Sequence, residues 1–311
     1  MTRSLRVILT LVAWLPLAAQ QAPRTADGHP DIQGIWTNAT ITPLERLPQF
    51  KDRPSLSEKE AVAYETRVDT EFNADRRGAT AEQDRDAAYN RLFIDRGDKL
   101  ARVDGVARTS LIIDPADGKV PALTAGARQR MAQRLRNSFD SVKDRPLGER
   151  CLLGFGSTSG PPMLPVLYNN NYQIVQTAGA VMILVEMVHD ARIIRTDGSP
   201  HLPAAIRKWT GDSIGHWEGA TLLVDTSNFT DKTRFRGSGE NLHVIERFTR
   251  VDHNTILYRV TVDDPESFAK PWMLEYPFIA TAGPIYEYAC HEGNYAMPDI
   301  LGGARRGDNK P

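Results

Sequence analysis

The sequence predicts a mainly β protein, with an antiparallel barrel-like or sandwich body behind a helical or irregular N-terminal segment. Short β-type runs separated by turn signals follow one another from residue 172 onward. Residues 31–150 are polar, rich in arginine and marked by helix-start signals. The 311 residues suffice for one large domain or two small ones. We therefore divide the chain into a signal peptide (1–19), an N-terminal segment packing on the body (20–150) and a β domain (151–311).

The first residues have the pattern of an export signal. Arg3 and Arg6 form a basic start, residues 7–17 an apolar run, and Ala18-Ala19 small residues before Gln20. This run is shorter than the roughly 20 residues that are needed to cross a bilayer. No later segment is long and apolar enough to cross one either. An uncleaved anchor or a buried helix is the alternative. We expect a secreted or periplasmic protein without a membrane span once the signal is removed.

Charge and cysteine content restrict the partners. The formal net charge of −1 gives no basic field for nucleic acid, so a small molecule or an uncharged polymer is the expected partner. The oligomeric state stays open. The only two cysteines, Cys151 and Cys290, are expected to form one disulfide in an oxidising compartment. The alternative, Cys290 with His291 as metal ligands or as a thiol nucleophile, lacks the usual ligand spacing.

Helix signals dominate the N-terminal segment. Ser57 begins a capping box for a helix through Arg67 and beyond, and Thr80 repeats that signature for a helix ending near Gly97. Thr124 caps a third predicted helix, which runs to about Val142. Between the second and third helices, residues 109–113 are predicted as a strand. Residues 152–165 form a Gly/Ser/Pro loop that matches neither a dinucleotide fingerprint nor a nucleophile elbow.

Beyond this loop the hydrophobic period becomes two. The predicted strands cover residues 172–177, 181–195, 221–226, 242–251, 255–262, 272–279 and 285–290. A short helix is expected at Pro203–Trp209. Seven or so strands with mostly short connections favour a barrel or sandwich, and a lipocalin-like (calycin-like) barrel is the nearest guess.

Alternation within strands divides their side chains between two faces. Leu242, Val244 and Phe248 share an apolar face with Glu246, so this carboxylate is expected to point inward. Glu186 shares a face with Arg192 in the run 181–195, where both faces begin apolar and end in ionisable groups. We expect the end of such a strand to lie at the mouth of a cavity. A buried structural ion pair between Glu246 and Arg192 or Arg247 is the alternative.

The candidate site residues follow from these faces and from the histidines, whose imidazoles act as acids, bases or ligands near neutral pH. Glu246 or Glu186 is the expected base or acid, with His189 as its partner and Arg192 binding an anionic or carbonyl oxygen. The remaining catalytic candidates are His216 and His291. An aromatic wall for the substrate is expected from Trp217, Tyr258, Trp272 and Tyr288.

No cofactor is expected, although a divalent metal remains an alternative. Its ligands would be His189, His201, His216 and His291, drawn from separate strands. Their spacing gives no support, because no helix carries two histidines around a glutamate and no cysteine pairs occur. His243 and His253 are expected at the surface, outside the site.

Three stretches, residues 209–219, 246–252 and 286–295, together with Pro30–Trp36, are similar to segments of a group of uncharacterised secreted bacterial proteins. This resemblance covers most of the chain. It implies export and a common fold, and it carries no activity, cofactor or catalytic residue.

These observations favour an exported hydrolase or lyase that acts on a small organic or carbohydrate-like substrate by general acid–base chemistry in a barrel cavity. A non-catalytic lipocalin-like binding protein is the first alternative, because the same lumen would simply hold a ligand. A structural or partner-binding envelope protein is the second.

Overall fold

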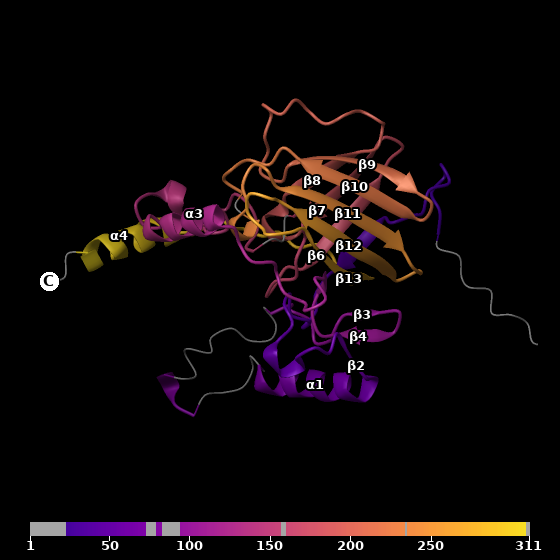
Figure 1. Ribbon diagram of the computed structural model, residues 1–311, viewed down its shortest axis with the longest axis horizontal. Coiled ribbons are helices and arrows are strands. Elements are labelled where there is room, and N and C mark those ends of the chain that lie inside the picture. Colours follow the sequence, from indigo (N-terminus) through magenta and orange to yellow (C-terminus); the bar gives the residue numbers. More distant parts are fainter. Residues whose placement is uncertain (1–22, 73–78, 83–93, 157–159, 234, 309–311) are drawn as a thin grey trace, which may run out of the picture.

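Nine strands close into a barrel, which confirms the predicted barrel-like, mainly β fold (Figure 1). The computed structural model describes residues 23–72, 79–82, 94–156, 160–233 and 235–308. In barrel order the strands are β1 (Gly34–Thr37), β6 (Asn171–Gln176), β7 (Ala180–Val185), β8 (Ala191–Arg195), β9 (Asp212–Glu218), β10 (Thr221–Ser227), β11 (His243–Arg250), β12 (Thr255–Asp263) and β13 (Trp272–Ala280). Pairing of β1 with both β6 and β13 completes the ring.

An odd number of strands cannot close with antiparallel pairs alone, so one pair must be parallel. That pair is β8 and β9, joined through the two register positions Ile194↔Ser213 and Arg195↔Ile214. A parallel pair needs a crossover connection instead of a tight turn. Residues 196–211 make this crossover.

The strand directions give the barrel two different ends. Short turns at residues 177–179, 219–220 and 251–254 lie at one end, here called the turn end. The connections 186–190, 228–242 and 264–271 lie at the other, here called the loop end, where the chain also enters β6 from residue 170. The loop end therefore carries most of the irregular structure that can shape a site.

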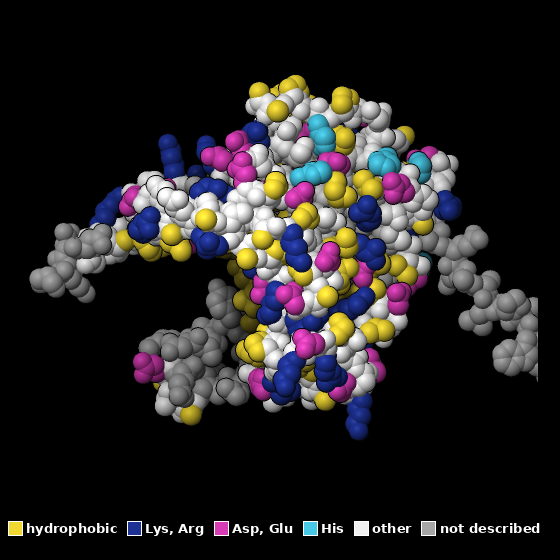
Figure 2. All heavy atoms as spheres, in the orientation of Figure 1, with side chains coloured by type: hydrophobic (Ala, Val, Ile, Leu, Met, Phe, Trp, Pro, Cys, Tyr) yellow, Lys and Arg dark blue, Asp and Glu magenta, His cyan; other side chains and the backbone are white. Residues whose placement is uncertain are grey.

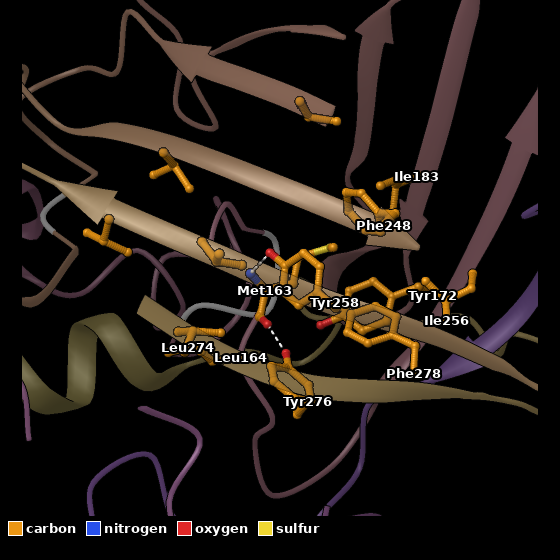
Figure 3. Packing of buried hydrophobic residues seen from close by; sticks show 14 of the residues in the cluster. Met163, Leu164, Tyr172, Ile183, Phe248, Ile256, Tyr258, Leu274, Tyr276 and Phe278 are labelled. Carbon is orange, nitrogen blue, oxygen red and sulfur yellow. Dashed lines mark hydrogen bonds between the residues drawn. The ribbon is translucent and has the colours of Figure 1, made fainter. Parts of the chain in front are cut away.

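The barrel interior is a packed core. Along β11 and β12 every second residue is buried, so Val244, Phe248, Tyr258 and Val260 point inward. Figure 3 shows the rings of Tyr258 and Tyr276 beside Met163, from the segment before β6, and the Phe278 ring beyond Tyr258. Burial of this apolar and aromatic surface is the main favourable term for the fold.

The N-terminal segment contributes strands as well as a separate small unit. β5 (Ile112–Asp114) pairs with β13, and β1 belongs to the barrel itself. β2 (Ser55–Leu56), β4 (Val106–Arg108) and β3 (Arg102–Val103) form a three-stranded sheet beside α1 (Glu58–Glu71). Ser57 begins α1 with the predicted capping box, which is confirmed by both reciprocal hydrogen bonds.

Two helices lie at the loop end of the barrel in Figure 1: α3 (Ala125–Arg136) and α4 (Ala296–Asp308). Thr124 caps the N-terminus of α3 as predicted, but the helix ends at Arg136, well before Val142. Its C-cap is Asn137, and a 3-10 helix, η3 (Val142–Asp144), follows. Leu135, in the last turn of α3, and Phe139, beyond its end, are both exposed.

Three predicted elements are wrong. The single strand 181–195 is β7 and β8 separated by a 3-10 turn, η4 (Met187–His189), because Val188 and His189 adopt left-handed backbone angles that end a strand. Residues 285–290 form no strand; three of the six are exposed and none is buried. Pro203–Trp209 forms turns instead of a helix. The signal peptide and most of the helix predicted after Thr80 lie outside the described residues.

The predicted disulfide between Cys151 and Cys290 is present. It fastens the C-terminal segment, which leaves the barrel after β13, to the segment that precedes β6. Among the described residues, no helix is both long and apolar enough to cross a membrane.

Candidate functional site

Glu246 lies inside the barrel and is fully buried, as the alternation of β11 predicts. Arg192, on β8, donates two hydrogen bonds to its carboxylate, one over 3.1 Å from Nη1 to Oε1 and a second from Nη2 to Oε2. The Tyr258 hydroxyl donates a third over 2.7 Å. Arg192 is only 4% exposed. The predicted alternative partner, Arg247, is not involved in this fork.

The hydrogen bonds continue from Tyr258 into the segment before β6 (Figure 3). The Tyr258 hydroxyl accepts from the Met163 amide over 3.1 Å, and the Tyr276 hydroxyl donates to the Met163 carbonyl. Asn38 donates to the hydroxyls of Tyr172 and Tyr276, each over 3.3 Å. Burial raises the pKa of Tyr258 and Tyr276 well above the ordinary value, so both stay protonated donors.

This network has the geometry of a buried structural ion pair. Both Glu246 oxygens are engaged, the charge is matched by Arg192, and the surrounding space is filled by aromatic rings. A general base needs hydrogen-bond access to the proton it removes. Catalysis by Glu246 or Arg192 stays a prediction that this arrangement does not favour.

The other predicted catalytic residues lie apart. Glu186, at the loop end, is buried and accepts hydrogen bonds from the Asn171 amide over 2.8 Å and the Tyr286 backbone amide over 3.3 Å. His189 is exposed in the β7–β8 turn, and His291 is exposed in the C-terminal segment. His216 stands on the outer wall near the turn end.

The His216 side chain is 63% exposed and pairs with Glu218 over 3.2 Å. The predicted aromatic wall is likewise dispersed. Trp217 stacks on His29 and Tyr288 on Tyr168, whereas Trp272 is buried between Phe235 and Phe268. Only Tyr258 joins Arg192 and Glu246 in the network described above.

His201 belongs to a cluster on the outer wall that the sequence reasoning missed. Its Nδ1 lies 3.1 Å from Asp212 and its Nε2 lies 3.1 Å from Asp225, which also receives Nε2 of His243 at 2.9 Å. His243 and Asp225 are diagonal neighbours on adjacent strands, because Asp225 is opposite Ile245. Alternation along β11 places His243 on the outer face. Only the strand register shows that Asp225 is its neighbour.

This cluster, here called the crossover clamp, holds the connection between β8 and β9. Asp212, at the start of β9, also accepts from Arg195, Lys208 and the Leu202 amide. Burial raises the pKa of Asp212, but these bonds outweigh it and leave the pKa well below the ordinary value. The clamp therefore has a structural role at the parallel seam. Among the described residues, no group of three or more His, Cys, Asp or Glu side chains is arranged to hold a metal.

A pocket with a volume of about 760 Å³ opens at the loop end of the barrel. Its walls come from α3, from residues 138–156, from the segment 160–164 and from the connection between β10 and β11. The apolar lining side chains are Met131, Leu135, Phe139, Leu147, Leu153, Phe155, Leu164 and Phe235. Such a size and lining are typical of small-molecule sites.

Local sequence explains how these walls come together. Gly237, in η5 (Phe235–Gly237), has a left-handed backbone, and a Cβ there would meet the Met131 sulfur at 2.8 Å. Glycine therefore lets α3 rest against this connection. On the other wall, Arg145 forms a bidentate pair with Glu149 over 2.8 and 3.0 Å and lies over the Phe139 ring.

The pocket lining is strongly cationic. Six lining residues are basic and one, Asp144, is acidic: the basic residues are Arg134, Lys143, Arg145, Arg150, Lys232 and Arg236. Asp144 accepts a hydrogen bond from the Ser141 hydroxyl over 2.6 Å. The sequence predicted a helix from Thr124 to about Val142 and a Gly/Ser/Pro loop at residues 152–165 in this region. The available signal was the presence of both basic and large apolar residues between positions 131 and 155.

Figure 2 shows the same character on the visible face. Cationic side chains follow the arm that α3 and α4 form beside the barrel, and apolar side chains are exposed along its lower edge. Leu135, Phe139 and Val142 are among the exposed large apolar residues. Exposed apolar surface of this kind, rimmed by polar residues, is typical of an interaction site.

No protein-family model, curated protein or solved structure matches the chain.

Proposed function

We propose that the chain is a binding protein for a small molecule with a largely apolar body, held in the loop-end pocket. The observation that carries this proposal is the pocket itself, which has a volume of about 760 Å³ and opens at the barrel mouth. Ligand sites in barrels commonly lie at the mouth, where a rigid wall meets variable loops.

The difference in burial among the apolar lining residues supports this function. Leu153, Leu164 and Phe235 line it and are buried, so they offer an apolar floor on top of the barrel core. Leu135 and Phe139 line it and are exposed, so they lose solvent contact when a ligand arrives. Covering apolar surface contributes roughly 25 cal/mol per Å² to binding before entropy costs.

Binding is favoured over catalysis by the positions of the titratable groups. Glu246 is enclosed and fully paired, and His216 lies on the outer wall near the turn end. Within the described lining, the acidic side chain is Asp144, and no histidine is present. The pocket thus offers contacts and charge without an arranged acid–base pair.

We further propose that this protein acts outside the cytoplasm. The basic and apolar start of the chain and the disulfide support an oxidising compartment. Mass spectrometry of protein produced in a bacterial host tests this. We expect an N-terminus near Gln20, and an intact Met1 on all molecules would contradict export.

Titration with N-phenyl-1-naphthylamine, an uncharged apolar fluorophore, tests the binding function. We expect enhanced fluorescence with wild type and its loss with Leu135→Asp, which places a charge on the pocket wall. Ile206→Asp is the matched control, because Ile206 is also an exposed apolar residue but does not line the pocket. Absence of enhancement with wild type, or equal enhancement with both variants, would overturn the proposal.

A further inference from the structure

We propose that the loop-end pocket selects amphipathic anions, meaning molecules with an apolar body and one carboxylate or phosphate head. This inference rests on the proposed binding function and names the ligand class of the same site. It is carried by four lining cations, Lys143, Arg150, Lys232 and Arg236, which have no ion pair with any carboxylate of the described residues.

Several cations elsewhere in the described chain form ion pairs with carboxylates. Arg102 binds Glu58 and Glu65, Arg192 binds Glu246, and Arg195 binds Asp212. Within the pocket, Arg145 is also neutralised, by Glu149. Lys143, Arg150, Lys232 and Arg236 therefore concentrate positive charge at one place on a chain whose formal net charge is −1. A cleft lined by one sign of charge attracts ligands of the other sign.

Burial gives the bound molecule an orientation. Lys143, Lys232 and Arg236 are exposed, so they form a rim, whereas Leu153, Leu164 and Phe235 are buried beneath them. The apolar body of a ligand would enter toward the barrel core and its head group would stay at the rim. This order of apolar floor and cationic rim fits an amphiphile better than a uniformly polar sugar.

The types of cation specify the head group. Arg236 and Arg150 offer planar guanidinium forks that match carboxylate and phosphate oxygens, and the two lysines add mobile point charges. Nη1 of Arg150 lies 3.5 Å from the Lys143 carbonyl, so Arg150 is close to the rim. A free alkyl phosphate and the head of an anionic membrane lipid present the same chemistry.

Calorimetric titration with four octyl amphiphiles tests the selectivity. Octyl phosphate and octanoate carry the anionic head, octyl glucoside is uncharged, and octyltrimethylammonium is cationic. We expect both anions to bind at least tenfold more tightly than the glucoside, and the cation to bind most weakly. Raising NaCl from 20 to 300 mM should weaken the anions alone, because salt screens exposed charges.

Paired double variants locate the effect. Lys143→Gln/Lys232→Gln removes two rim charges and should abolish most of the preference for octyl phosphate, while the uncharged fluorophore still binds. Lys59→Gln/Lys270→Gln removes two exposed lysines outside the pocket and should bind like wild type. Equal losses in both variants would overturn the assignment to this rim.

The remaining outcomes separate this inference from the proposed function. Equal affinity for octyl phosphate and octyl glucoside, with fluorophore binding intact, would overturn anion selectivity alone. Failure of all amphiphiles and of the fluorophore would overturn both. Cosedimentation with phosphatidylglycerol vesicles but no binding of octyl phosphate would overturn a pocket ligand in favour of a membrane surface.

Discussion

At the scale of single residues, Glu246 is the side chain that the sequence places most accurately. Alternation along β11 predicts its inward position, and the structure buries it completely. Its partner followed less clearly, since the sequence offered both Arg192 and Arg247. Arg192 satisfies the carboxylate because β8 and β11 face one another across the barrel interior. Pairing across a barrel depends on its closure, which no single strand encodes.

The buried pair predicts an asymmetric pattern of stability. Glu246→Gln leaves Arg192 as an uncompensated buried charge, and we expect unfolding to become easier by about 3–5 kcal/mol. The double variant Arg192→Met/Glu246→Leu should be less destabilised than the single variant, because no lone charge remains. Urea unfolding monitored by tryptophan fluorescence measures both. A double variant as unstable as the sum of its two single variants would contradict a pair that acts as one unit.

The crossover clamp predicts a dependence of stability on pH. The hydrogen bond and charge of Asp225, with Asp263 nearby, raise the pKa of His243 above its ordinary 6.5. Charged His243 therefore stabilises the fold fully below pH 6.5, and this contribution is lost as the pH rises through the raised folded-state value. His243→Gln should reduce the free energy of unfolding more at pH 5.5 than at pH 8.5.

Asp225 sets the lower boundary of the same window. Burial raises its pKa, but the hydrogen bond and charge of His243 outweigh this and leave it below 3.8. Its contribution is present above pH 3.8 and fades as the pH falls through the lowered value. His253→Gln is the control, because His253 is exposed and lies in the turn at the other end. An equal effect of the two substitutions at all pH values would contradict the clamp.

At the scale of elements, periodicity predicted the strands that form hairpins and failed where the backbone leaves the extended region. β10 to β13 match their predicted ranges closely, and β10 to β12 alternate buried and half-buried residues throughout. The run 181–195 breaks at Val188 and His189, whose left-handed angles leave no trace in the hydrophobic pattern. Residues 285–290 alternate as a strand would, but a disulfide and ring stacking hold them instead.

The disulfide is a covalent tether with a predicted effect on stability. It joins positions 139 residues apart, so removing it frees a long loop in the unfolded chain. We expect Cys151→Ser/Cys290→Ser to lower the free energy of unfolding by about 2–5 kcal/mol. Thermal unfolding of the variant and of the wild type under dithiothreitol should agree with each other. A reduced wild type that unfolds at its oxidised temperature would contradict this role.

At the scale of the whole molecule, barrel closure was predictable as a class but not as an architecture. Seven or so predicted strands lacked β1 and β9, the second of which forms the parallel seam with β8. β1 is a four-residue strand far from β6 in sequence, and its pairing on both sides emerges only in the assembled ring. The near-neutral charge of the whole chain similarly concealed the cationic pocket, because acidic residues outside the pocket offset its positive charge.

We propose that ligands occupy the loop-end pocket, whereas the barrel interior is a packed core. Methyl-labelled NMR spectra of isoleucine, leucine and valine, recorded with and without octyl phosphate, test it most directly. We predict shifts at Leu135, Leu147 and Leu153, which line the pocket, and none at Val224 and Val260, which are buried in the barrel core. Shifts confined to Val224 and Val260 would contradict this assignment and would place the ligand in the barrel lumen.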